Sequence, residues 1–261
     1  MIVDSHCHLH DPAFADVRGA ITRAIEHDVW GVVGVGCDPV TNARTLDAVA
    51  GNGKAVWAAL GFHPEWGRLA HEDLVLVEEQ VVRNHSRIVA LGEVGLPWYS
   101  LDGAPDAAER MARGLERFHR LLRLASRFDL PVIVHAPHGA AVGALEALKT
   151  RRVERAVFHW HKAPAEVTRA IVEAGYFVSV TPEVVYRERD RELVESVPLE
   201  SLLVESDGPW PYKGEFLGIP SGPWLVARVA EEVAKIKRLP IEETMYRLTV
   251  NTCQLFDLVW A

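Results

Sequence analysis

The chain has 261 residues, of which 49% are hydrophobic and 25% are charged, and its formal net charge is −8 at pH 7. This balance is typical of a globular protein with a large apolar core. It argues against binding of nucleic acid through a broad basic surface, so any nucleic-acid substrate would need local attraction, for example from bound metal ions.

Short runs rich in β-branched apolar residues alternate with stretches of helical spacing along the whole chain. The predicted strands, in chain order, are Ile2–Ser5, Gly31–Gly36, Lys54–Gly61, Ile88–Glu93, Pro131–His135, Arg155–His159, Tyr176–Val180 and Ser201–Glu205. The clearest helical stretches are Pro105–Phe128 and Ser221–Arg238, and the segment Asp207–Pro223, rich in Gly, Pro and aromatic residues, predicts a long loop. A last helical segment, around Ile241–Leu248 and Asn251–Leu258, is expected to pack on the outside.

Several predicted strands, such as Val32–Val35 and Leu202–Val204, are apolar on both faces, which is typical of parallel strands covered by helices. Eight successive βα units predict a TIM-type (β/α)₈ barrel with an extra C-terminal helical segment. An open doubly wound sheet shows the same alternation and is the alternative. Since no linker or internal repeat divides the chain, we expect a single domain spanning residues 1–261.

The cysteines and the N-terminal segment bear on the cellular compartment. Cys7, Cys37 and Cys253 are odd in number, far apart and without a CxxC pattern, which predicts reduced thiols. The N-terminal segment lacks the pattern of a signal peptide, and no apolar run approaches about 18 residues. We therefore expect a cytoplasmic protein that does not enter a membrane, and nothing in the sequence calls for an obligatory protein partner.

Histidine or carboxylate residues stand at the end of one predicted strand after another. They are His6, His8, His63, Glu93, His135, His159 and Asp207. Active sites of (β/α)₈ barrels lie at the carboxyl ends of the strands, so the positions predict that these side chains meet at one rim. A hydrogen-bonded core histidine is the alternative for any single one, and for His63 in particular, but it does not account for the whole set.

The spacing and chemistry of these residues favour a metal site. Residues two apart in an extended segment project to the same side, so His6 and His8 are expected to converge on one cation. Glu93 has two oxygens and can bridge two cations about 3.5–4 Å apart, while Asp207 can bind a cation and accept a proton from water. Asp4 shares the parity of the two histidines, and it either orients an imidazole or is a hydrogen-bonded residue of the barrel interior. Mixed imidazole and carboxylate ligands suit Zn, Mn, Fe or Ni, and carboxylate-rich sites also take Mg.

The motifs DSHCHL, GFHP, GEVGL, VIVHA, VFHWH, LLVESDGPW and NTCQLF occur in this order along essentially the whole chain. Each motif alone is weakly specific, but the set is specific. It resembles the motifs of the TatD family of metal-dependent hydrolases and deoxyribonucleases within the amidohydrolase superfamily. The resemblance implies two divalent cations, Zn, Mg or Mn. It assigns His6, His8 and Asp207 to one cation, His135 and His159 to the other, and Glu93 to both. It also places Glu205 and His63 beside the cations, in contact with substrate or water.

The chain departs from the family pattern at three places that surround the substrate. Pro97 follows GEVGL where many members have Asp, Ala136-Pro137-His138 follows His135 instead of Ser-Arg-Asp, and Trp160-His161-Lys162 follows His159 where Cys-Phe-Ser-Gly is usual. These departures lie outside the six ligands, so they leave the metal chemistry intact and bear on whether DNA is the substrate.

The resemblance predicts a phosphoesterase that acts on single-stranded DNA as a 3′–5′ exonuclease, with Asp207 as the acceptor of the proton from the attacking water. Trp98, Trp160 and Trp210 either stack on bases or pack the loops at the mouth, and Lys162, Arg187, Arg189 and Lys213 are candidate phosphate contacts. Two alternatives remain open. The same ligands could hydrolyse a small-molecule ester, lactone or amide, or the protein could be a non-catalytic metal-binding scaffold.

Overall fold

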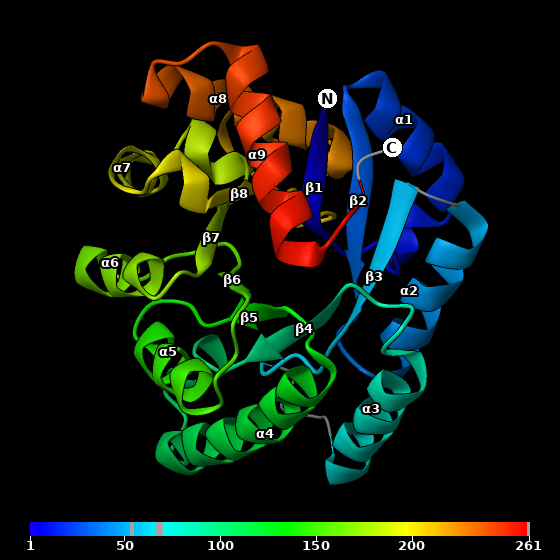
Figure 1. Cartoon of the computed structure of the whole chain (residues 1–261), viewed down its shortest axis with the longest axis vertical. Helices are drawn as coiled ribbons and strands as arrows, with labels where there is room; N and C mark the ends of the chain where they lie inside the picture. The colour runs from blue at the N-terminus through cyan, green and yellow to red at the C-terminus, as the bar shows by residue number, and fades with distance from the viewer. Residues whose placement is uncertain (53–54, 66–69, 260–261) are drawn as a thin grey trace.

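The computed structural model describes residues 1–52, 55–65 and 70–259 (Figure 1). Its centre is an eight-stranded parallel sheet whose spatial order, β1 to β8, follows the order of the chain. The strands are β1 (Ile2–Cys7), β2 (Val29–Val35), β3 (Val56–Leu60), β4 (Ala90–Gly95), β5 (Val132–His135), β6 (Ala156–Phe158), β7 (Phe177–Val180) and β8 (Leu202–Val204). The sheet curls into a nearly closed barrel, so the predicted (β/α)₈ fold is confirmed. The doubly wound alternative is wrong, because its strand order reverses direction whereas this order does not.

Helices surround the barrel (Figure 1). They are α1 (Val17–Glu26), α2 (Pro39–Asn52), α3 (His71–Asn84), α4 (Ala107–Phe128), α5 (Ala140–Thr150), α6 (Ala165–Glu173), α7 (Glu188–Ser196), α8 (Val226–Lys237) and α9 (Ile241–Phe256). In α4, Phe118, Leu121, Leu122 and Ala125 are buried, and their spacing places them on one face against the strands. Within the described residues, no helix combines the length and the apolar character that crossing a membrane requires.

Two helix boundaries differ from the sequence prediction. The stretch predicted from Ser221 begins with a 3-10 turn over Pro223–Leu225, and the regular helix α8 begins only at Val226. A proline starts the 3-10 turn because its fixed φ suits a first turn and it has no N–H to leave unpaired. The last segment, predicted in two parts, is the single helix α9.

Polar side chains at the predicted strand ends lie within two of the observed strands. β1 continues through His6 to Cys7, and β4 continues through Glu93 to Gly95, because their backbone ladders with the neighbouring strands extend past the polar residues. Asp207, in contrast, lies in the loop that follows β8. The predicted start of the third strand at Lys54 falls outside the described residues, and β3 begins at Val56.

At the rim of the barrel, hydrogen bonds join the end of the first strand, β1, to the end of the last strand, β8. The Ser5 hydroxyl donates to the Val204 carbonyl at 3.0 Å, and the Asp207 amide donates to the His6 carbonyl at 3.0 Å. The His8 amide donates to the Gly208 carbonyl at 2.9 Å. Closure of the barrel therefore places Asp207 directly beside the two N-terminal histidines.

Asp4 joins the ends of the same two strands from inside the barrel. Its carboxylate accepts hydrogen bonds from the backbone amides of His6, at 3.1 Å, and Ser206, at 2.9 Å, and from the Ser206 hydroxyl. Complete burial raises its pKa to about 7. Of the two roles considered for Asp4, the structure supports the hydrogen-bonded interior residue, since the carboxylate orients backbone rather than an imidazole.

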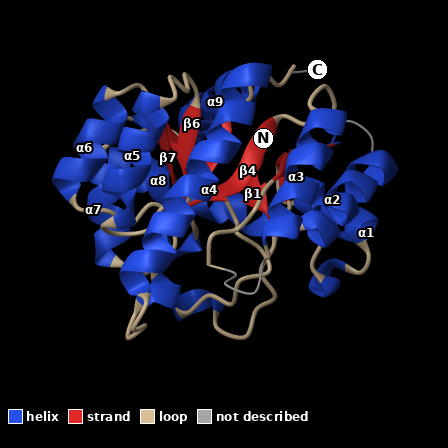
Figure 2. Cartoon of the chain, turned by 90° about the horizontal axis from the view of Figure 1, so that it is seen from below, coloured by secondary structure: helices blue, strands red, loops and turns tan. Residues whose placement is uncertain are grey.

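Helix α9 covers the end of the barrel opposite the long loops (Figure 2). Leu255 and Phe256 of α9 belong to the same apolar cluster as Val3, Ile133 and Leu203 of the strands. The expectation that this segment packs only on the outside is therefore wrong. Its apolar face closes the barrel core because the strand residues at that end leave an apolar surface that needs a cover.

Asn251 is expected to be important for stability. Its Nδ2 donates to the carbonyls of Leu199, at 2.7 Å, and Leu202, at 2.9 Å, all in a buried setting. Asn251→Ala leaves both carbonyls without this donor and should lower the free energy of unfolding by about 1–3 kcal/mol in urea denaturation. Gln254→Ala, on the exposed face of the same helix, is the control and should change it by less than about 0.5 kcal/mol. Equal stability of the two variants would contradict this role.

Candidate metal centre

The first group of converging side chains comes from the carboxyl ends of the first and last strands, β1 and β8. The Nε2 atoms of His6 and His8 are 3.3 Å apart. Asp207 Oδ1 lies 3.4 Å from His6 Nε2 and 3.3 Å from His8 Nε2. Cys7, between the two histidines, points elsewhere and is buried, as the alternation of side chains along a strand requires.

The second group consists of imidazoles at the ends of β3, β5 and β6. All three face Glu93 Oε1, which lies 3.2 Å from His63 Nε2, 2.6 Å from His135 Nδ1 and 2.7 Å from His159 Nε2. His135 Nδ1 and His159 Nε2 are themselves 3.4 Å apart. His63, for which a core role was the alternative, thus points into the same centre as the six predicted ligands.

Glu93 belongs to both groups. Its Oε2 lies 3.4 Å from His6 Nε2 and 3.7 Å from His8 Nε2, whereas its Oε1 faces the second group. The side chain is only 1% exposed. Burial alone would raise its pKa, but the charges of His159 and His63 and the hydrogen bonds from His135 and His159 hold the pKa well below its usual range. The carboxylate therefore stays ionised and presents one oxygen to each group.

The donor atoms fit a pair of divalent cations. Glu93 Oε2 and Asp207 Oδ1 are buried and accept no hydrogen bond from the described residues. A buried acceptor without a partner costs about 1–3 kcal/mol, and more when it is charged, so a cation between these groups would satisfy it. In the sets His6, His8, Glu93 and His63, Glu93, His135, the ligand atoms lie within 4.8 Å of one another. Imidazole nitrogens mixed with carboxylate oxygens are suitable ligands for Zn or Mn.

Glu205 lies behind His159 and not at the cavity wall. Its Oε1 is 3.3 Å from His159 Nδ1 and accepts the Trp160 amide at 2.7 Å, while its Oε2 accepts the Ser179 hydroxyl at 2.6 Å. The residue is 1% exposed. This geometry orients the imidazole for a ligand role, whereas the predicted contact of Glu205 with substrate or water finds no support in its position.

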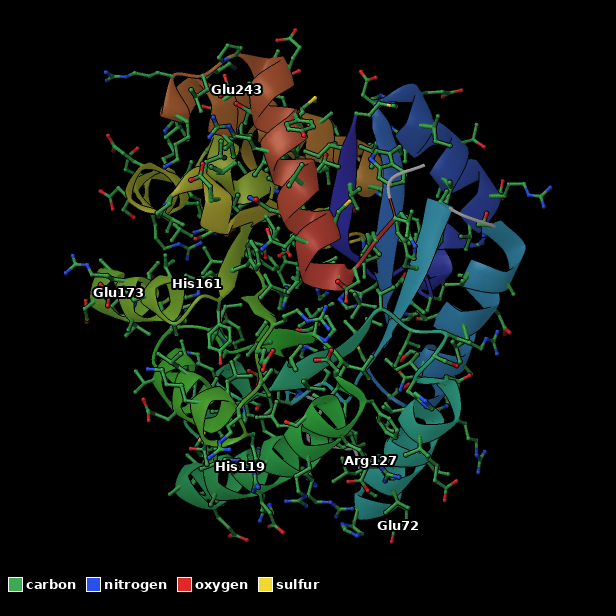
Figure 3. The ribbon with its side chains drawn as sticks, in the orientation of Figure 1. Glu72, His119, Arg127, His161, Glu173 and Glu243 are labelled. Atoms are coloured by element: carbon green, nitrogen blue, oxygen red, sulfur yellow. The ribbon has the colours of Figure 1, made fainter. Side chains whose placement is uncertain are left out.

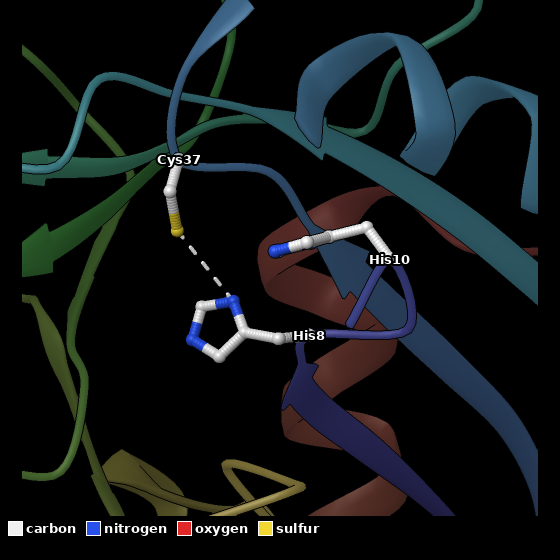
Figure 4. Close-up of side chains that lie close together, drawn as sticks. All are labelled: His8, His10 and Cys37. Atoms are coloured by element: carbon white, nitrogen blue, oxygen red, sulfur yellow. Dashed lines mark hydrogen bonds between the residues drawn. The ribbon is translucent and has the colours of Figure 1, made fainter. Parts of the chain in front are cut away.

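Cys37 and His10 lie near His8 (Figure 4), and Cys37 contacts its Nδ1 atom, whereas its Nε2 atom faces His6 and Asp207. The Val35 carbonyl lies 3.2 Å from His8 Nδ1 and 3.0 Å from His10 Nδ1, so it fixes both rings. The Cys37 thiol is 3.6 Å from His8 Nδ1, and burial raises its pKa to about 11. The Cys37 thiol is therefore protonated and His10 Nδ1 is bonded to a carbonyl, so neither atom is free to bind a cation. Their contacts instead hold the His8 ring in place. All three cysteines are free, as predicted.

Glu65 also contacts the centre, and no sequence pattern predicted this, although the residue directly follows the GFHP motif. Its carboxylate accepts the backbone amides of Trp98, Tyr99 and Ser100 at 2.6–3.0 Å, and its Oε1 lies 3.4 Å from His135 Nε2. Burial would raise the pKa of Glu65, but these hydrogen bonds hold it below its usual range. Glu65 therefore connects the loop after β4 to a predicted ligand. Its signal in the sequence was weak, because a single loop glutamate is usually only solvated.

The centre lies at the bottom of a cavity of about 720 Å³. Among its lining residues are the aromatic Tyr99, Trp160 and Trp210 and the basic Lys162, Arg187 and Arg189. Lys213 is not among the described residues that line the cavity. Trp98 and Trp210 are 37% and 52% exposed, whereas Trp160 packs edge-on against Trp210 with ring centroids 5.3 Å apart. Packing thus accounts for Trp160, and Trp210 presents an exposed ring at the cavity wall, whereas Trp98 is not among the described residues that line the cavity.

The sequence also matches a model of the family described as TatD related DNase, over residues 3–257. This chain belongs to the TatD family of metal-dependent hydrolases. The TatD fold and the convergence of ligands seen here agree with that membership. The crystal structure of YjjV, a TatD homologue from Escherichia coli, superimposes with a TM-score of 0.88 at 29% identity and covers 99% of this chain and 98% of its own.

Relatives of this TatD-family chain match it over nearly their whole lengths. A protein of Haemophilus influenzae, named an uncharacterized metal-dependent hydrolase, is 28% identical, and the match covers 99% of this chain and 100% of that protein. The human protein named deoxyribonuclease TATDN3 is 27% identical over 98% of this chain and 94% of its own length. One of these relatives is thus named a metal-dependent hydrolase and the other a deoxyribonuclease.

Binding of a cation by this TatD-family centre should release protons. Burial would lower the pKa of His159, but the charges of Glu93 and Glu205 raise it to about 10, and contacts with Glu65 and Glu93 raise that of His135. Since a ligand must give up its proton, affinity should rise with pH up to about this value. Calorimetric titration with Mn²⁺ at pH 7, in buffers of different ionisation enthalpy, should show about one or more protons released per chain. A heat that does not depend on the buffer would contradict the assignment.

Proposed function

We propose that this TatD-family hydrolase cleaves phosphoesters with two divalent cations that share Glu93, and that its substrate is single-stranded DNA attacked from the 3′ end. One observation carries the proposal. The two oxygens of a single buried carboxylate face two separate sets of ligands, His6, His8 and Asp207 on one side and His63, His135 and His159 on the other. Such a shared carboxylate is suited to two-metal hydrolysis.

The cations, when bound, would supply the electrostatic part of the chemistry: they lower the pKa of water from about 15.7 toward about 7 and neutralise charge on the phosphate oxygens. His6, His8 and Asp207 would hold one of them and His135 and His159 the other. His63 lies beside Glu93 at the same rim, within reach of either the second cation or the substrate.

Asp207 is the residue best placed to receive the proton of the attacking water. It lies at the cavity wall and is 6% exposed. Burial would raise its pKa, but the close contact with His8 and the charges of His8 and His6 hold that pKa below its usual value. The carboxylate is therefore ionised near neutral pH and can accept a proton.

The size and charge of the cavity support a chain end as the substrate. A volume of about 720 Å³ is that of a small-ligand site and would admit a terminal nucleotide but not an intact duplex. Basic residues at its wall supply local attraction for phosphate on a protein whose net charge is −8. The human relative named deoxyribonuclease is consistent with this substrate.

Glu93→Gln tests the shared carboxylate. The amide keeps the shape but loses the charge, so metal content measured by mass spectrometry should fall below that of the parent, and turnover should fall about a thousandfold, the equivalent of several kcal/mol. Glu232→Gln is a matched control, because Glu232 is also buried but pairs with Arg191 and Arg228, outside the metal centre. Parent-like metal content and turnover in Glu93→Gln would contradict the proposal.

Asp207→Asn tests the proton acceptor. The amide cannot take up a proton, so we expect kcat on a 3′-labelled single-stranded oligonucleotide to fall at least about a hundredfold, with KM changed much less. Circular dichroism should show an intact fold. A variant that retains the parent kcat with a full complement of metal would overturn the role.

A substrate panel separates phosphoester hydrolysis from the alternatives. The metal-loaded protein is assayed on a single-stranded oligonucleotide, a phosphomonoester, a lactone and a simple amide. Degradation of the oligonucleotide from its 3′ end is the expected result. Hydrolysis of only the lactone or amide would show instead a carbonyl-directed amidohydrolase, and activity on none of them would favour a non-catalytic metal protein.

A further inference from the structure

Lys162 is a cation on the cavity wall whose closest contacts among the described residues are aromatic side chains. It lies in the loop after β6, half-buried, with its Nζ 3.6 Å from the centre of the Trp160 ring and 3.5 Å from the Tyr99 hydroxyl. None of the described carboxylates forms an ion pair with it. Burial lowers its pKa, while the more distant carboxylates of Glu183, Asp207 and Asp190 act in the opposite direction.

The neighbouring arginines differ from Lys162, because carboxylates already compensate them. Arg187 Nε lies 2.6 Å from Glu183 Oε1, and Arg189 Nη2 lies 3.1 Å from Glu183 Oε2 and 2.8 Å from Asp190 Oδ2. Two guanidinium groups therefore face two carboxylates. Of these three cations, Lys162 is the one that forms no direct ion pair with a described carboxylate.

The backbone that directly precedes Lys162 is firmly anchored. His161 turns away from the cavity toward α6, where its Nε2 is 2.8 Å from the Thr168 hydroxyl (Figure 3). The Trp160 indole N–H donates to Glu183 Oε2 at 3.2 Å, and the Trp160 amide donates to Glu205 Oε1 at 2.7 Å. Since the preceding backbone is held and Nζ contacts Trp160 and Tyr99, the ammonium group is positioned before any substrate arrives, which reduces the entropy that binding costs.

Lys162 is also close to the metal centre. The Tyr99 ring, whose hydroxyl contacts Lys162, lies 6.4 Å from the His135 ring, measured between centroids. One aromatic side chain thus separates the ammonium group from a predicted ligand. If the scissile phosphoester of a substrate lies at the cations, the adjacent group along the substrate would lie near Lys162.

We propose that Lys162 binds a second phosphate of the substrate, the one adjacent to the scissile phosphoester along a single strand. The inference rests on the proposed function for the identity of the reacting group. The anion subsite itself stands on an ammonium group without a direct ion pair, on the aromatic side chains that contact it and on the anchored backbone before it. Lys162 is accordingly a specificity residue, which favours substrates with two consecutive phosphates over isolated phosphoesters.

The test compares two dinucleotides with the same scissile bond, thymidylyl-thymidine with and without a 5′-phosphate. The parent protein should prefer the phosphorylated form, and Lys162→Met, of similar length and without charge, should reduce this preference in kcat/KM at least about tenfold. Lys162→Arg should retain most of it. Lys149→Met, on the exposed surface of α5, is the control and should leave the preference unchanged. A ratio of the two kcat/KM values that is the same in Lys162→Met and the parent would overturn the proposal.

Equilibrium binding separates this inference from the proposed function. In EDTA, where no hydrolysis is expected, tryptophan fluorescence should report tighter binding of the phosphorylated dinucleotide to the parent than to Lys162→Met. If the parent hydrolyses neither dinucleotide but shows this difference, the phosphoesterase proposal fails and the anion subsite stands. If the phosphate makes no difference to binding, or the same difference in both proteins, the anion subsite is overturned whatever the outcome of the hydrolysis assay.

Discussion

The arrangement of the metal centre depends on the buried, ionised carboxylate of Glu93. Burial inside a barrel favours the protonated form of a carboxyl group, yet the imidazoles that surround Glu93 hold its pKa well below the usual range. The same ring nitrogens point at the space around its two oxygens, so they become cation ligands once they release their protons. A charge that is costly to bury is thus stabilised only by the arrangement that also binds cations, so the stability of the interior and the metal chemistry depend on each other.

Closure of the barrel makes this arrangement possible. His6 and Asp207 are 201 positions apart, and they meet because β1 and β8 close the sheet through hydrogen bonds of Ser5, Asp4 and the backbone. At the other end, α9 covers the apolar core and leaves the carboxyl ends of the strands open (Figure 2). Structural residues thus concentrate at one end and reactive residues at the other, as in other barrels of this type.

The sequence predicted the fold and the members of the centre because both depend on periodic or positional signals. The alternation along β1 predicted that His6 and His8 converge, and the positions at strand ends predicted that His135 and His159 join them. Glu65, Cys37 and His10 escaped prediction, since they reach the centre through loop conformations that no periodicity encodes. Glu205 was identified as a residue of the centre, but only the structure shows that its oxygens are engaged by Ser179 and Trp160.

The departures from the TatD motifs that the sequence suggests lie outside the residues of the metal centre. These departures lie in the loops after β4, β5 and β6, and the last of these loops carries Trp160 and Lys162. The metal centre depends on the shared carboxylate, and electron paramagnetic resonance of the protein loaded with Mn²⁺ tests it most directly. Two ions bridged by Glu93 at about 3.5–4 Å should be exchange-coupled and give a multiline spectrum. A six-line spectrum of isolated ions at every loading would contradict the account.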